Sequence, residues 1–142
     1  MSNISASQVK ELREKTGLGL MDCKKALEEA NGDLDLAIEE LRKSSGLKAS
    51  KKSSRSAADG LIGIKSFEGR SFMVEINCET DFVARDDSFN AFMEEVLKII
   101  STNADKGLQE LLDESIEEQR EKLVQKLGEN IVVRRIASSD NN

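Results

Sequence analysis

The segment EINCETDFVAR, residues 75–85, decides how the second half of this chain folds. Around it every second residue is apolar, which is the period of a half-buried strand, and these residues are Phe72, Val74, Ile76 and Cys78. Residues 79–81 break the alternation, and apolar residues return at helical spacing from Phe89, with Ser88 as the predicted N-cap. Phe82 therefore lies in or beside a connection. Its ring can either fold back onto the core, as large apolar side chains in loops usually do, or face a partner.

The remainder of the second half predicts an α+β unit. Strand patterns occupy residues 61–67 and 71–78, with a short glycine-containing hairpin turn between them. Helical patterns follow over residues 88–100 and 108–127, and a last strand over residues 131–137. We therefore expect a three-stranded antiparallel sheet with a helical hairpin covering one of its faces.

The first 41 residues predict three short helices. Ser5 or Ser7 can cap the first helix, and Gly17 is placed to end it. The second helix has a predicted buried stripe of Met21, Cys23, Ala26, Leu27 and Ala30, and the third begins at Asp33 or Asp35 with Leu41 facing inward. This pattern is typical of ubiquitin-associated domains, which are three-helix bundles that bind partners through the first loop and the last helix. Leu20 and Met21 can either plug such a bundle or protrude from it, and we expect at least one to protrude.

A basic, serine-rich stretch separates these helices from the second half. Residues 42–57 carry a charge of +6 and the remainder of the chain carries −12. Such a stretch can follow phosphates, but it contains no aromatic residue for base stacking, and the acidic remainder disfavours nucleic acid. We therefore interpret it as a mobile linker, which divides the chain into residues 1–55, the three helices with this linker, and residues 56–142, the α+β unit.

The composition disfavours an enzyme and a metal site. The chain has no His, which is the commonest general base and the commonest metal ligand. Cys23 and Cys78 both lie in apolar patterns, so we expect buried, reduced thiols rather than a disulfide or a metal site. No cofactor is expected. No apolar run reaches the ~18 residues of a membrane span, and no signal-peptide pattern precedes the first helix, so we predict a cytoplasmic protein without membrane contact.

Four segments resemble the elongation factor Ts family, in the order in which the family carries them. They are residues 9–41, residues 57–63 (AADGLIG), the Thr-Asp-Phe-Val stretch of residues 80–83, and residues 126–136 (KLGENIVVRRI). The resemblance implies a guanine-nucleotide exchange factor that binds elongation factor Tu in its GDP-bound and nucleotide-free states. It also implies that the first three helices share the ubiquitin-associated fold.

The resemblance assigns roles to particular residues. Asp81 and Phe82 match the family pair that enters between two helices of elongation factor Tu near its Mg²⁺ and phosphate site. Leu20 and Met21 match a pair that contacts the nucleotide-binding domain of that partner. Further contact positions of the family match Arg13, Leu127 and Gly128. An exposed arginine on a helix is also ordinary without any partner, so Arg13 keeps that second interpretation.

The chain departs from the long members of the family, whose core has two similar halves. This sequence contains the first half only, as in a naturally short or a truncated form, and a second copy of the chain is a candidate partner for the sheet. Two other function classes stay open. One is an adaptor for ubiquitin-fold proteins or nascent chains that acts through residues 5–42. The other is a thiol enzyme that uses Cys23 or Cys78, although nothing near either residue in the sequence would lower its pKa.

Overall fold

Three helices pack around a small core at the N-terminal end of the molecule. The computed structural model describes residues 3–140, and its first helices are α1 (Ala6–Thr16), α2 (Leu20–Glu29) and α3 (Leu34–Lys52). Ser5 caps α1 through a capping box with Gln8, and Gly17 ends it in the left-handed conformation. The helices enclose a hydrophobic cluster of Val9, Leu12, Leu18, Cys23, Ala26, Leu27, Ala30, Ala37 and Leu41. Met21 does not belong to this cluster, so its predicted place in the buried stripe of α2 is wrong.

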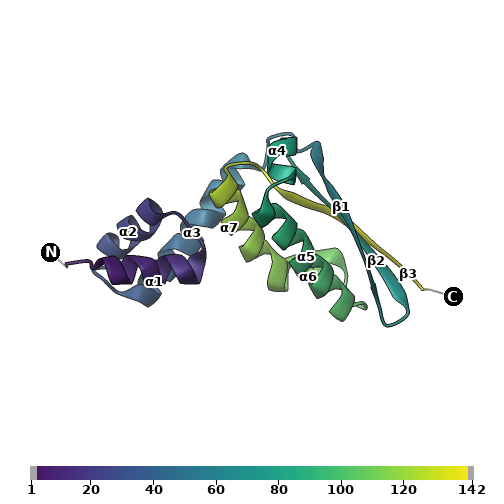
Figure 1. The fold of residues 1–142 in the computed structure, drawn as a ribbon, viewed down its shortest axis with the longest axis horizontal. Coiled ribbons are helices and arrows are strands. Elements are labelled where there is room, and N and C mark those ends of the chain that lie inside the picture. Colours follow the sequence, from purple (N-terminus) through teal and green to yellow (C-terminus); the bar gives the residue numbers. More distant parts are fainter. Residues whose placement is uncertain (1–2, 141–142) are drawn as a thin grey trace.

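The third helix is longer than the sequence pattern predicts. α3 continues past Leu41 to Lys52, so most of the stretch interpreted as a linker is helical. Ser45 and Ala49 are buried on this extension, which packs along α7 (Glu117–Leu127). Both residues are small and lie four apart, so they let the two helices approach closely while contributing little to an apolar pattern. Figure 1 shows α3 extending from the N-terminal helices to the side of α7.

The sheet is antiparallel and has three strands, as predicted. Its strands are β1 (Asp59–Phe67), β2 (Arg70–Cys78) and β3 (Val132–Asp140), in the order β1-β2-β3. Glu68 and Gly69 both have positive φ in the turn between β1 and β2, as tight two-residue hairpins require. A bulge lies in β3 opposite Glu75 and Ile76, between Val133 and Arg135. The last strand pairs with β2 as far as Arg70 and so reaches Asp140, beyond its predicted end at Ala137.

One face of the sheet is covered by α5 (Asp87–Thr102), which contacts β1 and β2. Gly63 makes this contact possible, because a Cβ at this position would lie 2.5 Å from Met93 Sδ and 2.9 Å from Leu97 Cδ1. The alternating residues Phe72, Val74, Ile76 and Cys78 are all buried beneath the helices, as the sequence predicts. The other face of the sheet leaves Ile62, Ile64 and Met73 exposed.

The predicted second helix of the hairpin is interrupted. It consists of α6 (Leu108–Leu111), a π-helical turn η1 (Leu112–Ile116) and α7. Leu111 and Ile116 lie five residues apart and are both buried in the core, which a π-helical turn accommodates because it bonds residues five apart. None of the helices within residues 3–140 combines the length and the apolar composition that a membrane-spanning segment requires.

Candidate partner-binding site

The predicted connection after β2 contains a single helical turn, α4 (Asp81–Ala84). Thr80 caps this turn by accepting the Val83 N–H at 3.4 Å. Val83 and Ala84 face the core and are 9% and 6% exposed, whereas Phe82 is 79% exposed. The ring of Phe82 therefore does not fold back onto the core. The turn is anchored by its second half and presents an aromatic side chain to solvent.

Asp81 is also exposed, next to Phe82 on the same turn. Its Oδ2 lies 3.3 Å from Arg85 Nη2, and both side chains are more than half exposed. Exposed ion pairs of this kind contribute little to stability, about 0–1 kcal/mol, and are easily exchanged for other partners. The Asp81 carboxylate is therefore available to a binding protein at little cost.

The carboxylate of Glu129 holds the backbone immediately before α4, a contact that the sequence analysis missed. Glu129 Oε1 accepts the N–H groups of Glu79 and Thr80 at 3.1 and 3.0 Å, and Oε2 accepts the Thr80 hydroxyl at 2.7 Å. Glu129 follows Gly128, which ends α7 in the left-handed conformation with φ +76°. Leu127 is half-buried against the core, so Gly128 rather than Leu127 is the exposed member of that predicted pair.

Leu20 and Met21 both protrude from the start of α2. They are 53% and 72% exposed, while Leu18 is 2% exposed and fills the bundle in their place. The expectation that at least one of the pair protrudes is therefore confirmed for both. Asp22, the next residue, accepts a hydrogen bond from Gln125 Nε2 of α7 at 3.3 Å, and Gln125 also contacts the Ser45 hydroxyl of α3.

Arg13 lies near the same end of α7. It lines a cavity of about 200 Å³ together with Gly17, Leu18, Gly19, Asp22, Gln125 and Lys126. Two hydrogen bonds link the end of α7 to the neighbours of the other predicted site residues. Gln125 bonds Asp22, the residue after Met21, and Glu129 bonds Thr80, the residue before Asp81.

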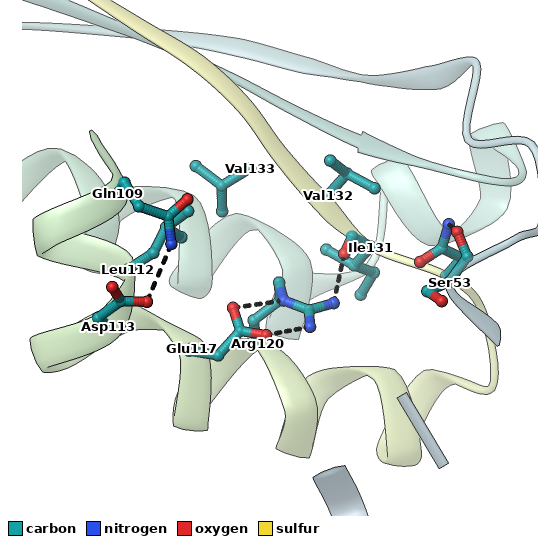
Figure 2. A pocket seen from close by; sticks show the side chains of 10 residues that line it. Ser53, Gln109, Leu112, Asp113, Glu117, Arg120, Ile131, Val132 and Val133 are labelled. Carbon is teal, nitrogen blue, oxygen red and sulfur yellow. Dashed lines mark hydrogen bonds and ion pairs between the residues drawn. The ribbon is translucent and has the colours of Figure 1, made fainter. Parts of the chain in front are cut away.

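A larger cavity of about 400 Å³ lies elsewhere, between α7 and the start of β3. Figure 2 shows Arg120 at its centre, where its guanidinium contacts Glu117 and donates to the Ile131 carbonyl at 2.8 Å. Because these contacts use the charge of Arg120 to join helix and strand, the described residues that line the cavity offer no free cation. It contains none of the predicted site residues.

The two thiols are buried and their surroundings do not favour a thiol enzyme. Burial, together with the nearby carboxylates of Glu129 and Asp59, raises the pKa of Cys78 to about 11. Cys78 Sγ donates a hydrogen bond to the Thr80 carbonyl at 3.1 Å. Its thiol is therefore protonated at neutral pH and helps to hold the residue that precedes α4. Within the described part of the chain, no group of three or more His, Cys, Asp or Glu residues is placed to hold a metal ion.

Comparison with known proteins identifies close relatives of the chain. Residues 79–142 match the family model described as Elongation factor TS. The chain is 54% identical over 138 residues to elongation factor Ts of Marinobacter nauticus, a match covering 96% of this chain and 48% of that protein. It is 57% identical over 136 residues to elongation factor Ts of Saccharophagus degradans, covering 94% and 47%. The chain spans about half the length of the curated relatives it matches. These matches confirm the resemblance inferred from the sequence.

Proposed function

We propose that this relative of the elongation factors Ts is a guanine-nucleotide exchange factor for elongation factor Tu, and that it promotes GDP release during polypeptide elongation. The single observation that carries the proposal is Phe82. It is 79% exposed on a turn whose neighbouring residues Val83 and Ala84 are buried. A large apolar side chain held out from an anchored turn is a costly arrangement in water, and it suits an anchor that enters a partner.

The mechanism requires no acid, base or nucleophile. A protein that binds the nucleotide-free form of its partner more tightly than the GDP form must weaken GDP binding by the same free energy. The family resemblance implies that Phe82 and Asp81 enter between two helices of the partner near its Mg²⁺ and phosphate site. Phe82 would supply buried apolar area with few rotatable bonds, and Asp81 would hydrogen-bond backbone amides or compete for the local cation.

A second contact region is proposed at the start of α2. Leu20 and Met21 would bind the nucleotide-binding domain of elongation factor Tu, with Arg13, Leu127 and Gly128 as further contacts. The exposure of Leu20 and Met21 and the position of Arg13 near the end of α7 support this arrangement. We further propose that residues 1–55 form a unit of the ubiquitin-associated type and residues 56–142 a second unit. In support of this, one hydrophobic cluster lies within residues 9–41, and the other lies within residues 72–133 apart from Ala49 of α3.

Two proposals concern the setting of this activity. The chain would act in the cytoplasm, where elongation factors work on the ribosome. It would also associate with a second copy of itself, because β1 and β3 are open edges of the sheet and Ile62, Ile64 and Met73 are exposed on its outer face.

The experiment that tests the function is the release of a fluorescent GDP analogue from elongation factor Tu. We expect release to accelerate with increasing concentration of this chain and to reach a plateau. An unchanged release rate at saturating concentration, with binding absent in a parallel titration, would refute the proposal. Binding of a ubiquitin-fold protein in place of elongation factor Tu would instead identify the chain as an adaptor that acts through its N-terminal helices.

A further inference from the structure

Glu129 makes hydrogen bonds that have no part in the exchange mechanism proposed above. Its carboxylate accepts three hydrogen bonds, from the backbone N–H groups of Glu79 and Thr80 and from the Thr80 hydroxyl. β2 ends at Cys78, so these two N–H groups lie just beyond the strand. Hydrogen bonds to an ionised carboxylate are roughly twice as strong as those between neutral groups. The segment before α4 is therefore fixed by a residue fifty positions later in the chain.

The backbone segment that carries the Glu129 side chain, residues 126–130, is itself fixed. Asn130 is 2% exposed, and its side-chain amide donates to the Arg55 carbonyl at 2.8 Å. On the other side of Glu129, Lys126 donates to the Ser88 hydroxyl at 2.9 Å and so joins α7 to the start of α5. The carboxylate thus projects from a short segment that is held at both ends.

Thr80 transmits this constraint to Phe82. The Thr80 hydroxyl donates its proton to Glu129 at 2.7 Å and accepts the Val83 N–H at 3.4 Å. Because the hydroxyl O–H is directed at the carboxylate, the lone pairs of the hydroxyl oxygen stay free to accept the Val83 N–H that caps α4. Cys78 Sγ donates to the Thr80 carbonyl at 3.1 Å, so Thr80 is held through its N–H, its hydroxyl and its carbonyl.

A turn of four residues needs such support. An isolated helix of this length is unstable in water, because helix nucleation is unfavourable. Without the contacts of Glu129, α4 would be held only by the burial of Val83 and Ala84 and its first half would be free to sample other conformations, which a partner would have to order on binding at a cost in affinity.

We propose that Glu129 is a positioning residue that locks the turn of residues 80–84 and so presents Phe82 for nucleotide exchange, an inference that rests on the function proposed above. It acts through Thr80 and touches no nucleotide. Glu129→Ala leaves two N–H groups and a hydroxyl without their acceptor. Glu129→Gln keeps the size of the side chain and one oxygen, but its NH₂ group would face the Thr80 hydroxyl and turn the hydroxyl proton away from its present acceptor.

The test uses the full chain with Glu129→Ala, Glu129→Gln, and Glu118→Gln as a matched control on the exposed side of α7. Amide hydrogen exchange is followed over residues 79–85, and GDP release from elongation factor Tu is titrated to separate the half-saturating concentration from the maximal rate. For Glu129→Ala we expect amide exchange to accelerate about tenfold or more over residues 79–85 only, and the half-saturating concentration to rise by a similar factor. Glu129→Gln should lie between this variant and the unaltered chain, and the control should match the unaltered chain.

Each outcome separates the two proposals. If the unaltered chain accelerates GDP release from elongation factor Tu and both folded Glu129 variants match its half-saturating concentration, the positioning role is wrong and the exchange function stands. If the unaltered chain does not accelerate GDP release, the exchange function is wrong and the positioning role in exchange is wrong with it. Amide hydrogen exchange then still decides whether Glu129 locks the turn. If Glu129→Ala does not fold, the test rests on Glu129→Gln. Faster amide exchange over residues 79–85 in that variant would support the positioning role, and unaltered protection there would overturn it.

Discussion

Replacing Phe82 with Ala separates a partner-binding side chain from a core side chain. Phe82 is 79% exposed, so only about a fifth of its surface contacts its own protein. A Phe side chain can bury ~150–250 Å² in all, so roughly 40 Å² is buried here, and at ~25 cal/mol per Å² this stabilises the fold by about 1 kcal/mol at most. The melting temperature should therefore fall by about 4 °C or less. A core Phe would instead lose about 3–5 kcal/mol.

The remaining roughly 160 Å² can be buried by elongation factor Tu, which sets an upper limit of about 4 kcal/mol on the contribution of the ring to binding. Because part of this is offset by ordering costs, we expect a loss of about 2 kcal/mol or more, or roughly thirtyfold in the partner equilibrium. Stopped-flow GDP release and melting curves on the same protein measure both quantities. Phe67→Ala, at the far end of β1 where the ring is 37% exposed, is the matched control and should leave exchange unchanged. Unchanged exchange by folded Phe82→Ala would refute the role assigned to this ring.

Four further predictions address the remaining surfaces and the core. The double variant Leu20→Ser/Met21→Ser should bind elongation factor Tu about tenfold more weakly in calorimetric titration. Its melting temperature should barely change, because both side chains are exposed, and a large loss of stability would contradict this. Leu36→Ser, at an exposed position on α3, is the control. Gly63→Ala should lower the urea-unfolding free energy by about 1–3 kcal/mol through overpacking against Met93 and Leu97. Gly107→Ala, where a Cβ meets open space, should cost less, because it loses only the preference for Gly over Ala at the N-cap of α6. Burial, with Glu117 nearby, raises the pKa of Glu121 above its ordinary 4.5. The folded state therefore holds this proton more tightly than the unfolded state, and the free energy of unfolding falls as pH rises through and above 4.5. Glu121→Gln should flatten this fall between pH 4 and 7 and raise stability at pH 7, and an unchanged slope would contradict the prediction. Sedimentation at micromolar concentration should detect a dimer, and a monomer at every concentration tested would show that the outer sheet face needs no second copy.

The sequence predicted those parts of the fold that depend on local periodicity. The alternation of Phe72, Val74, Ile76 and Cys78 identified β2 and its buried face, and the helical spacing from Phe89 identified α5. The exposure of Phe82 could only be stated as an alternative, because the residues beside it carry no period of their own. The structure resolves this through Val83 and Ala84, which occupy the inner side of α4 and leave the ring outside.

The features that the sequence did not predict depend on long-range contacts. The extension of α3 to Lys52 rests on Ser45 and Ala49, which are small residues in a stretch rich in basic side chains, so charge dominated the pattern. Met21 fits the helical spacing of a buried stripe, but Leu18, three residues earlier, already fills that space. Glu129 left no local signal, since its partners lie some fifty residues away. Such contacts follow from tertiary packing, which overrides local propensity.

The continuous helix α3 has a consequence for how tightly the two proposed contact regions can act together. Two binding regions joined by a flexible tether reach effective concentrations in the millimolar range, and a tether that matches the geometry of the target does better. α3 bears on the N-terminal helices with its first half and on α7 with its second, so the spacing and angle between Leu20–Met21 and Phe82 are set by helical register. One inserted residue between these halves would advance one region by about 1.5 Å and rotate it by about 100° relative to the other. Such an insertion should weaken the simultaneous binding of both regions, even though every contacting side chain is still present.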